Sequence, residues 1–461
     1  MDLAGFAASP AAPNFATRRA RLAALLGNRP ALLPSGVARP RNYVANTFPF
    51  RAQSHFLYLF GLPLRGAHGL WDGSQWTVFA PAPEPDAALW HGTEPSLGEL
   101  AQVLGCPVRP TDQLAAALPA QTATLPAPDL ETNRALAELL GRPIDRETFA
   151  AIDEPLADGL IQLRLCHDDA AVAELRAAAA ATALAHAAGM AATRPGIRES
   201  VVRAAMEAAL IGQGMTMAYG SIVTVHGEVL HNEVHHHLLG PRDLVLADVG
   251  AETAGGWAGD VTRTWPVAGQ YSSTQRDLYD VVLNAQLRAI AGVRPGVRYR
   301  DLHFLAATAM AEGLVALGIL RGDPAELVGD GVAYLLFPHG VGHLLGLDVH
   351  DMEDLGDRAG YAPGRKRSSE FGLRYLRLDR DLAAGMAVTI EPGLYIVPAI
   401  LDDPRLTARA KDRLDRTRLA QFDDVRGIRI EDDVLVTATG SEVLTQVIPK
   451  TRSAVEQAMR G

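Results

Sequence analysis

The segment Leu244-Val-Leu-Ala-Asp248-Val-Gly-Ala-Glu-Thr-Ala-Gly-Gly-Trp-Ala-Gly-Asp260-Val-Thr-Arg-Thr-Trp-Pro-Val267 decides the fold of the second half of this chain. An apolar run leads directly into Asp248, which is typical of a buried strand rather than an exposed one. The glycines that follow favour a turn, and β-forming residues resume after Asp260. We therefore expect two adjacent strands that present both carboxylates to one interior point.

Two buried carboxylates that face each other require a neutralising positive charge. An unpaired buried carboxylate costs roughly several kcal/mol, and two like charges at one site repel each other. Arg263 is close enough in sequence to form a structural ion pair with the aspartates. This segment alone therefore leaves two interpretations open, an ion pair with Arg263 or a metal site.

Three further segments supply candidate metal ligands. The run Phe337-Pro-His339-Gly-Val-Gly-His343-Leu-Leu-Gly-Leu-Asp-Val-His350 places three histidines among apolar residues and glycines. Two more apolar strands are expected to end in carboxylates, at Glu391 and Glu431. A carboxylate-rich set with one imidazole and no thiolate suits a pair of Mn, Co, Fe or Zn ions, whereas calcium prefers more carbonyl oxygens. The predicted ligands are Asp248, Asp260, His343, Glu391 and Glu431.

The ordered motifs LVLADVGAE, AGDVTRTWPV, HGVGHLLGLDVH, GMAVTIEPGLYI and GIRIEDDVLV closely resemble those of the pita-bread dimetal peptidases that act on Xaa-Pro bonds, aminopeptidase P and prolidase. The resemblance implies that Asp248 is a terminal bidentate ligand of one ion and that Asp260 and Glu431 bridge both ions. His343 and Glu391 would complete the second site. The metal expected first is manganese, with zinc or cobalt as alternatives. The loop between the aspartates is one residue longer than the family pattern, which we expect to move the loop tip more than the ligands.

The resemblance also implies how other side chains act in hydrolysis. A hydroxide bridging the two ions would attack the scissile carbonyl, and Glu391 would pass its proton to the leaving prolyl nitrogen. His350 and His231 would stabilise the carbonyl oxygen and the tetrahedral intermediate. His339 matches a position that lines the proline-side pocket, and Arg429 would orient the bridging glutamate.

The segment around His231 is rich in histidine, which invites a second metal assignment. It reads His226-Gly-Glu-Val-Leu-His231-Asn-Glu-Val-His235-His-His237. His231 matches the catalytic histidine of the family, and the Asn-Glu that follows is also similar. We expect His235 to His237 to be solvated loop residues.

The length of the substrate peptide stays open. AGDVTRTWPV and the following Ser-Thr-Gln-Arg-Asp-Leu-Tyr resemble aminopeptidase P, which removes the first residue from peptides of various lengths, and this is the first expectation. Gly372-Leu-Arg-Tyr-Leu-Arg377 and the insert over residues 398–426 resemble prolidase instead. There Arg377 would hold the carboxylate of a dipeptide through a bidentate fork, and an exposed arginine in a charged loop is the competing interpretation.

More remote alternatives are a creatinase-like hydrolase and a non-catalytic binding module of the same fold. Relatives that have lost the metal ligands keep the fold, so the fold alone does not decide between these alternatives and a peptidase. All five predicted ligands are present in this chain, which argues against a non-catalytic module.

The chain of 461 residues exceeds the usual size of one core, so two domains are expected. We expect a smaller N-terminal α/β domain over residues 1–158 and an α+β pita-bread domain over residues 159–461. The segment Arg51-Ala-Gln-Ser-His-Phe-Leu-Tyr-Leu-Phe-Gly61 resembles the N-terminal domain shared by aminopeptidase P, prolidase and creatinase. That resemblance implies a homodimer or homotetramer.

The overall composition limits which binding partners and which cellular compartment we expect. The net charge of -10, without a long basic run, argues against nucleic acid as a partner and leaves proline-containing peptides. No apolar run is long enough to span a membrane, and the N-terminal stretch lacks the layout of a secretory signal. Cytoplasmic residence without a membrane partner is therefore the expectation.

Overall fold

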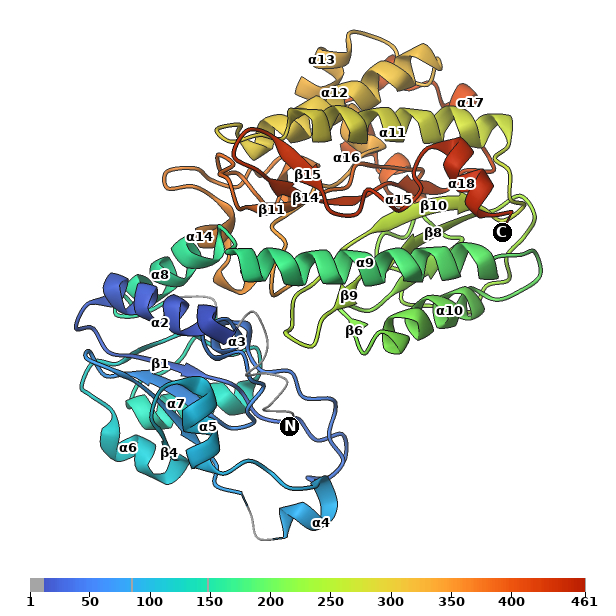
Figure 1. The fold of residues 1–461 in the computed structure, drawn as a ribbon. Helices are drawn as coiled ribbons and strands as arrows, with labels where there is room; N and C mark the ends of the chain where they lie inside the picture. Colours follow the sequence, from blue (N-terminus) through green and yellow to red (C-terminus); the bar gives the residue numbers. More distant parts are fainter. Residues whose placement is uncertain (1–11, 84–85, 147–148, 461) are drawn as a thin grey trace. The chain divides into compact units, whose positions relative to one another are not determined.

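The computed structural model describes residues 12–83, 86–146 and 149–460. Residues 1–11, which belong to the stretch compared above with secretory signals, lie outside these ranges. Contacts within the chain divide it into two compact units, Met1–Leu165 and Cys166–Gly461 (Figure 1). Each unit is described by itself below.

The division between the units follows helix α8 (Glu154–Arg164), rather than falling at 158/159. We expected a boundary there because proline and glycine often mark linkers. Pro155 instead lies in the first turn of α8, where a backbone N–H has no partner within the helix and its absence costs nothing. Gly159 lies against Leu22 of helix α2 (Ala12–Leu26), and a Cβ atom at this glycine would come within 2.9 Å of the leucine side chain. The proline therefore serves helix formation, and Gly159 serves helix packing.

The first unit contains a five-stranded sheet in the order β4-β3-β2-β1-β5. Strand β2 is antiparallel to β1 and to β3, whereas β1 pairs with β5 and β3 with β4 in parallel. The expected α/β unit is therefore confirmed. The strands are β1 Ala31–Pro34, β2 His68–Trp71, β3 Trp76–Ala80, β4 Val108–Pro110 and β5 Ala123–Thr124. The remaining helices are α3 Ser54–Phe60, α4 Ala87–His91, α5 Leu97–Leu104, α6 Leu114–Ala117 and α7 Leu130–Leu140.

Two long helix pairs flank the strands of the second unit (Figure 1). The first pair is α9 (Asp169–Ala192) with α10 (Glu199–Gly212), and the second is α11 (Ser273–Gly292) with α12 (Tyr299–Ala316). The side chain of Asp168 accepts a hydrogen bond from the N–H of Ala171 at 2.9 Å, so it caps α9. The repeated order of helices and antiparallel strands is the expected α+β layout, and the predicted fold class is confirmed.

The strands of the second unit pair in short antiparallel groups. One three-stranded sheet has the order β10-β8-β7 and another has the order β11-β14-β15, while β12 pairs with β13 and β6 with β9. The bounds are β6 Thr216–Met217, β7 Ile222–Thr224, β8 Leu244–Asp248, β9 Ala251–Glu252 and β10 Thr262–Pro266. The later strands are β11 Ala387–Ile390, β12 Gly393–Tyr395, β13 Gly427–Arg429, β14 Asp432–Val436 and β15 Ser441–Val443.

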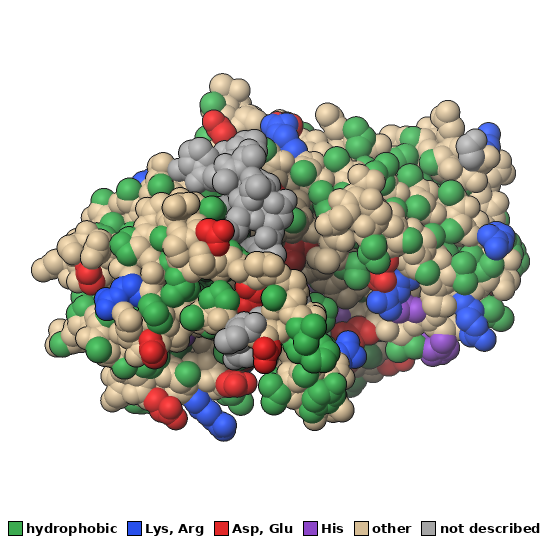
Figure 2. All heavy atoms as spheres, turned by 60° about the horizontal axis from the view of Figure 1, so that its bottom comes forward, with side chains coloured by type: hydrophobic (Ala, Val, Ile, Leu, Met, Phe, Trp, Pro, Cys, Tyr) green, Lys and Arg blue, Asp and Glu red, His purple; other side chains and the backbone are tan. Residues whose placement is uncertain are grey.

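Acidic and basic side chains are interspersed with apolar ones on the face drawn in Figure 2. Such mixing is the ordinary pattern of a solvent-exposed protein surface. Among the described helices, none combines the length and the apolar character that a bilayer span requires.

Candidate metal centre

One cavity of about 410 Å³ in the second unit brings together the residues that the sequence singled out. Its wall contains every predicted metal ligand, catalytic group and substrate-binding residue. These residues are Asp248, Asp260, His343, Glu391, Glu431, His231, His350, His339, Arg377 and Arg429. Apolar side chains complete the wall, among them Leu230, Phe371, Val397 and Ile400.

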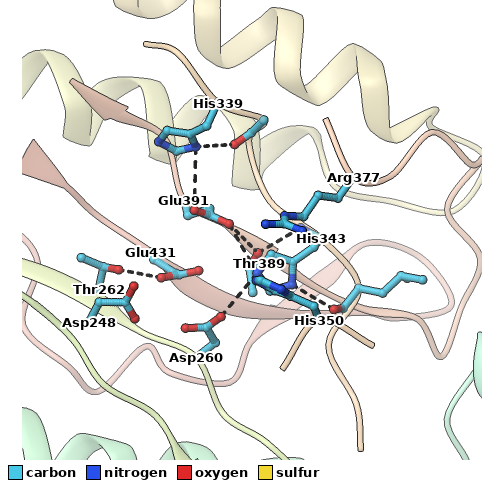
Figure 3. Close-up of polar contacts among 12 residues, drawn as sticks. Asp248, Asp260, Thr262, His339, His343, His350, Arg377, Thr389, Glu391 and Glu431 are labelled. Atoms are coloured by element: carbon cyan, nitrogen blue, oxygen red, sulfur yellow. Dashed lines mark hydrogen bonds and ion pairs between the residues drawn. The ribbon is translucent and has the colours of Figure 1, made fainter. Parts of the chain in front are cut away.

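Strand register brings the four predicted carboxylate ligands to neighbouring strand ends. In the β8–β10 pair, Asp248 lies opposite Thr262, so Asp260 lies just beyond the start of β10. In the β11–β14 pair, Ile390 lies opposite Asp432, so the residues next to them, Glu391 and Glu431, leave the same end of the pair. Figure 3 shows these side chains directed toward one region.

Glycine permits the close approach of the two segments that carry the aspartates. A Cβ atom on Gly250 would lie 1.8 Å from the carbonyl oxygen of Gly259, so no larger residue fits at this position without a backbone shift. The N–H of Gly259 donates to the carbonyl oxygen of Ala251 at 2.8 Å. The turn at the loop tip, where Gly256 donates to the carbonyl oxygen of Thr253, lies beyond this contact.

His343 is held to strand β11 by its own backbone. The N–H of Thr389 donates to the carbonyl oxygen of His343 at 3.0 Å, and the N–H of His343 donates to the Thr389 hydroxyl at 3.1 Å. Gly342 has φ +151°, and a Cβ atom there would meet the Thr389 carbonyl oxygen at 2.3 Å. The imidazole Nδ1 lies 2.9 Å from the Leu344 carbonyl oxygen, so Nδ1–H donates and leaves Nε2 toward the carboxylates.

The side chains of this site lie within coordination range of a common point. His343 Nε2 lies 3.3 Å from an Asp260 oxygen and 3.4 Å from a Glu391 oxygen. One donor atom each from Asp260, His343 and Glu431 lies within 4.8 Å of the other two. These three residues are buried in the wall of the cavity.

Electrostatics support a cation at this point. Burial and the neighbouring Asp248 raise the pKa of Asp260, and burial with Asp260 and Glu391 raises the pKa of Glu431 well above its usual range. Burial raises the pKa of Glu391 to about 7. Burial alone lowers the pKa of His343, but Asp260 and Glu391 raise it to about 9. Protons or cations must neutralise these carboxylates, so the residues present fit divalent metal binding.

Arg263 does not pair with the two aspartates, so that interpretation of the sequence is wrong. Its buried guanidinium donates to Asp432 at 2.7 Å. It also donates to the backbone carbonyl oxygens of Glu431, Ile448 and Pro449. Arg263 therefore holds the backbone of Glu431 to that of Ile448 and Pro449.

Arg429 donates hydrogen bonds to Asp248, Tyr395 and Thr262. Its NH2 group donates to Asp248 at 2.6 Å, NH1 to the Tyr395 hydroxyl at 3.0 Å, and Nε to the Thr262 hydroxyl at 2.8 Å. Thr262 in turn donates to Glu431 at 2.7 Å. Arg429 thus reaches Glu431 through a threonine, because strand β13 places its side chain beside β8 and β10.

The sequence reasoning missed two hydroxyl groups that hold the ligands. The Tyr219 hydroxyl lies 2.6 Å from an oxygen of Asp248 and 2.6 Å from an oxygen of Asp260, so its one proton serves both carboxylates. Thr262 could have been found, because it follows Asp260 by two residues and such residues share one face of a strand. Tyr219 lies in another part of the chain and has no comparable signal in the sequence.

His339 is linked to the metal ligands through Tyr395. The imidazole Nδ1 donates to the Gly340 carbonyl oxygen at 2.7 Å, and Nε2 accepts from the Tyr395 hydroxyl at 2.9 Å. The Tyr395 oxygen accepts from Arg429, so these bonds are consistent with one neutral tautomer of His339. Burial, with help from the Arg429 charge, lowers the pKa of His339 to about 3.

Two further histidines face the same cavity. Burial and the positive charges of His343 and Arg377 lower the pKa of His350 to about 2. Burial and Arg429 lower the pKa of His231. Both imidazoles are therefore neutral near pH 7 and can each donate one N–H. The rings of His343 and His350 lie 4.4 Å apart between centroids.

The residues His235 to His237 lie outside the cavity wall. The backbone N–H and Nδ1 of His237 both donate to one oxygen of Glu199, at 3.1 Å and 3.0 Å. Glu199 is fully buried at the start of helix α10. His235 Nδ1 donates to the Val223 carbonyl oxygen at 3.2 Å. The expected solvated loop therefore describes His236, whereas His235 and His237 tie the loop to α10 and β7.

Comparison with known proteins agrees with this geometry. Residues 173–438 match the model of metallopeptidase family M24, and residues 15–126 match the aminopeptidase P N-terminal domain. The probable Xaa-Pro aminopeptidase PEPP of Colletotrichum graminicola is 33% identical over 411 residues, which cover 87% of this chain and 86% of that protein. A second PEPP, from Fusarium vanettenii, is 33% identical over 426 residues, which cover 90% of this chain and 87% of that protein.

Solved structures of the same kind share the fold over nearly the whole chain. Pseudomonas aeruginosa aminopeptidase PepP is 29% identical, with a TM-score of 0.81, and the match covers 97% of this chain and 98% of that one. Zn-substituted E. coli aminopeptidase P in complex with product is 26% identical, with a TM-score of 0.79 and the same coverage. The predicted resemblance and the expectation of a metal-dependent peptide hydrolase are confirmed. The chain belongs to metallopeptidase family M24, with an aminopeptidase P N-terminal domain earlier in its sequence.

Proposed function

We propose that this protein removes the N-terminal residue from peptides that have proline in the second position, in a metal-dependent hydrolysis. The observation that carries the proposal is one cavity whose wall combines the predicted metal ligands, three imidazoles and an apolar surface. The relatives and structures named above, which are Xaa-Pro aminopeptidases or aminopeptidase P, support the same substrate class.

The proposed ligands are those predicted from the sequence. Asp248 would bind one ion, Asp260 and Glu431 would be shared, and His343 with Glu391 would complete the second site, with manganese expected first. Divalent ions in such a site lower the pKa of water from about 15.7 toward neutrality and so supply a nucleophile at physiological pH. The Zn-substituted relative is consistent with zinc as an alternative.

The chain's own residues would then handle the proton and the developing charge. Glu391 would accept the proton of the attacking water and pass it to the leaving nitrogen. His231 and His350, both neutral, would each donate a hydrogen bond to the carbonyl oxygen as its charge grows.

The proline ring would lie beside His339. This imidazole is fixed by Gly340 and Tyr395, so its ring is a rigid part of the wall. Phe371 and Val397 contribute apolar surface to the same cavity. A rigid, apolar wall suits a cyclic side chain that has no N–H to donate.

A dipeptidase of the prolidase type is the second candidate, because Arg377 lies in the wall of the same cavity. Its guanidinium could pair with the carboxylate of an Xaa-Pro dipeptide. Rates on Ala-Pro and Ala-Pro-Ala, measured after chelation and again after Mn²⁺ is restored, separate the two candidates. No metal-dependent cleavage of either peptide would refute both.

Homo-oligomerisation and residence in the cytoplasm stay predictions. Light scattering at several protein concentrations would measure the first, and a value equal to the monomer mass would contradict it. Elemental analysis of the purified protein would identify the bound metal.

A further inference from the structure

Arg377 is already paired with a carboxylate at the edge of the catalytic cavity. Its NH1 group donates to Glu353 at 2.5 Å, and the two side chains are 35% and 36% exposed. Arg377 contributes to the wall of the 410 Å³ cavity and to a neighbouring cavity of about 70 Å³, whereas Glu353 lines only the smaller one. The guanidinium therefore stands between Glu353 and the space for substrate.

An unusual backbone conformation presents Glu353 to this position. Met352, the residue before it, has φ +60° and ψ 22°, in the left-handed region that residues with a Cβ rarely adopt. The Met352 side chain is fully buried, which holds the conformation in place. The short helix Glu353–Leu355 starts here, and the Glu353 carboxylate also lies 3.6 Å from His350 Nδ1.

We propose that Glu353 is a specificity-determining residue that disfavours substrates with a free carboxylate on proline, and so shifts the enzyme from dipeptides toward longer peptides. The inference rests on the proposed Xaa-Pro activity. A dipeptide carboxylate at Arg377 would share one guanidinium with the Glu353 carboxylate, and the two negative charges would repel each other.

A longer peptide avoids this repulsion because a neutral amide follows its proline. Glu353 accepts from NH1, and a guanidinium carries five N–H donors, so Arg377 can still donate to a peptide carbonyl oxygen. The ion pair is about one-third exposed, so water and salt screen the effect and it should be modest.

The test compares Ala-Pro with its amide Ala-Pro-NH2, because the two substrates differ only in the carboxylate. In Glu353→Gln the ratio of kcat/KM for Ala-Pro to kcat/KM for the amide should rise about two- to fivefold over the wild-type ratio. The change should come from the KM of the dipeptide and should shrink as salt is added. A merely structural change would move both substrates alike.

Glu442→Gln is the matched control. Glu442 pairs with Arg176 at 2.6 Å, and its side chain is 35% exposed, but neither residue lines the catalytic cavity. This variant should leave the substrate ratio unchanged. Glu353→Ala gives a second test if the glutamine variant folds poorly.

An unchanged or lower ratio in a folded Glu353 variant would overturn the inference while leaving the proposed function intact. A wild-type protein that cleaves neither substrate after metal is restored would overturn the proposed function, and the role of Glu353 with it. The two failures are therefore distinguishable from the wild-type rates alone.

Discussion

The metal-free catalytic unit should lose stability as the pH rises from 7 to 9, and bound metal should reduce that loss. Glu391 has a pKa of about 7 in the folded protein against an ordinary 4.5, so the folded state keeps a proton that the unfolded state releases. The contribution of Glu391 is therefore lost between these two values, while His339 and His350, whose pKa values are lowered, add stability up to about pH 6.5. His343 has a pKa of about 9 against 6.5, so its contribution is complete below pH 6.5 and is lost as the pH rises through 9.

The size of the loss follows from the pKa shifts. One pKa unit corresponds to about 1.4 kcal/mol, so each group alone accounts for about 3 kcal/mol between its two pKa values. His343 and Glu391 lie 3.4 Å apart, so their contributions overlap and do not simply add. Between pH 7 and 9, where the histidines with lowered pKa values are neutral in both states, His343 contributes most and we expect a loss of about 2 to 3 kcal/mol. Bound Mn²⁺ at a hundred times its Kd would restore about 2.7 kcal/mol.

Urea unfolding at pH 7, 8 and 9, after chelation and again with Mn²⁺, measures the effect. The transition to follow is the one that Mn²⁺ shifts, because the chain has two units. Glu391→Gln should remove part of the pH dependence, whereas Glu442→Gln, outside the cavity, should not change it. Metal-free stability that stays constant or increases from pH 7 to 9 would refute the electrostatic reasoning.

Three substitutions test individual residues. Glu391→Gln should lower kcat by about 10² to 10⁴ while circular dichroism stays native, and a near-native rate would exclude the proton-transfer role. Arg429→Met leaves Asp248 without its buried partner and should cost about 3–5 kcal/mol in urea unfolding, so a loss below about 1 kcal/mol would contradict the importance of that pair. Tyr219→Phe keeps the ring but removes the hydroxyl shared by the two aspartates. It should weaken metal binding about 10- to 100-fold in a metal titration, and unchanged affinity would show that the hydroxyl is dispensable.

The sequence predicted which side chains meet, because the carboxylate-bearing segments carry local signals. Apolar runs that end in Asp248 and in Glu391 identify strand ends, and the glycines after Asp248 identify the turn. A cavity wall that contains every predicted site residue is consistent with that reasoning. The role of each residue in it stays a prediction.

The partners of charged residues could not be predicted in the same way. Arg429 is two residues from Glu431 in sequence, yet it donates to Asp248, which is distant in sequence. Tyr219 reaches both aspartates from a different segment. Such contacts depend on how strands pack in three dimensions, and no local pattern in one sequence encodes them.

The hydrogen bonds from Arg263 to the carbonyl oxygens of Ile448 and Pro449 also affect the order in which the chain folds while the ribosome synthesises it. Arg263 is fully buried, and its partners Asp432, Ile448 and Pro449 follow it in the sequence by 169 to 186 residues. An uncompensated buried guanidinium is strongly unfavourable. The second unit should therefore complete its folding only after Pro449 has left the ribosome, whereas the unit ending at Leu165 can fold earlier. Nascent chains stalled before Ile448 should then remain sensitive to protease in the second unit, and protected chains would contradict this order.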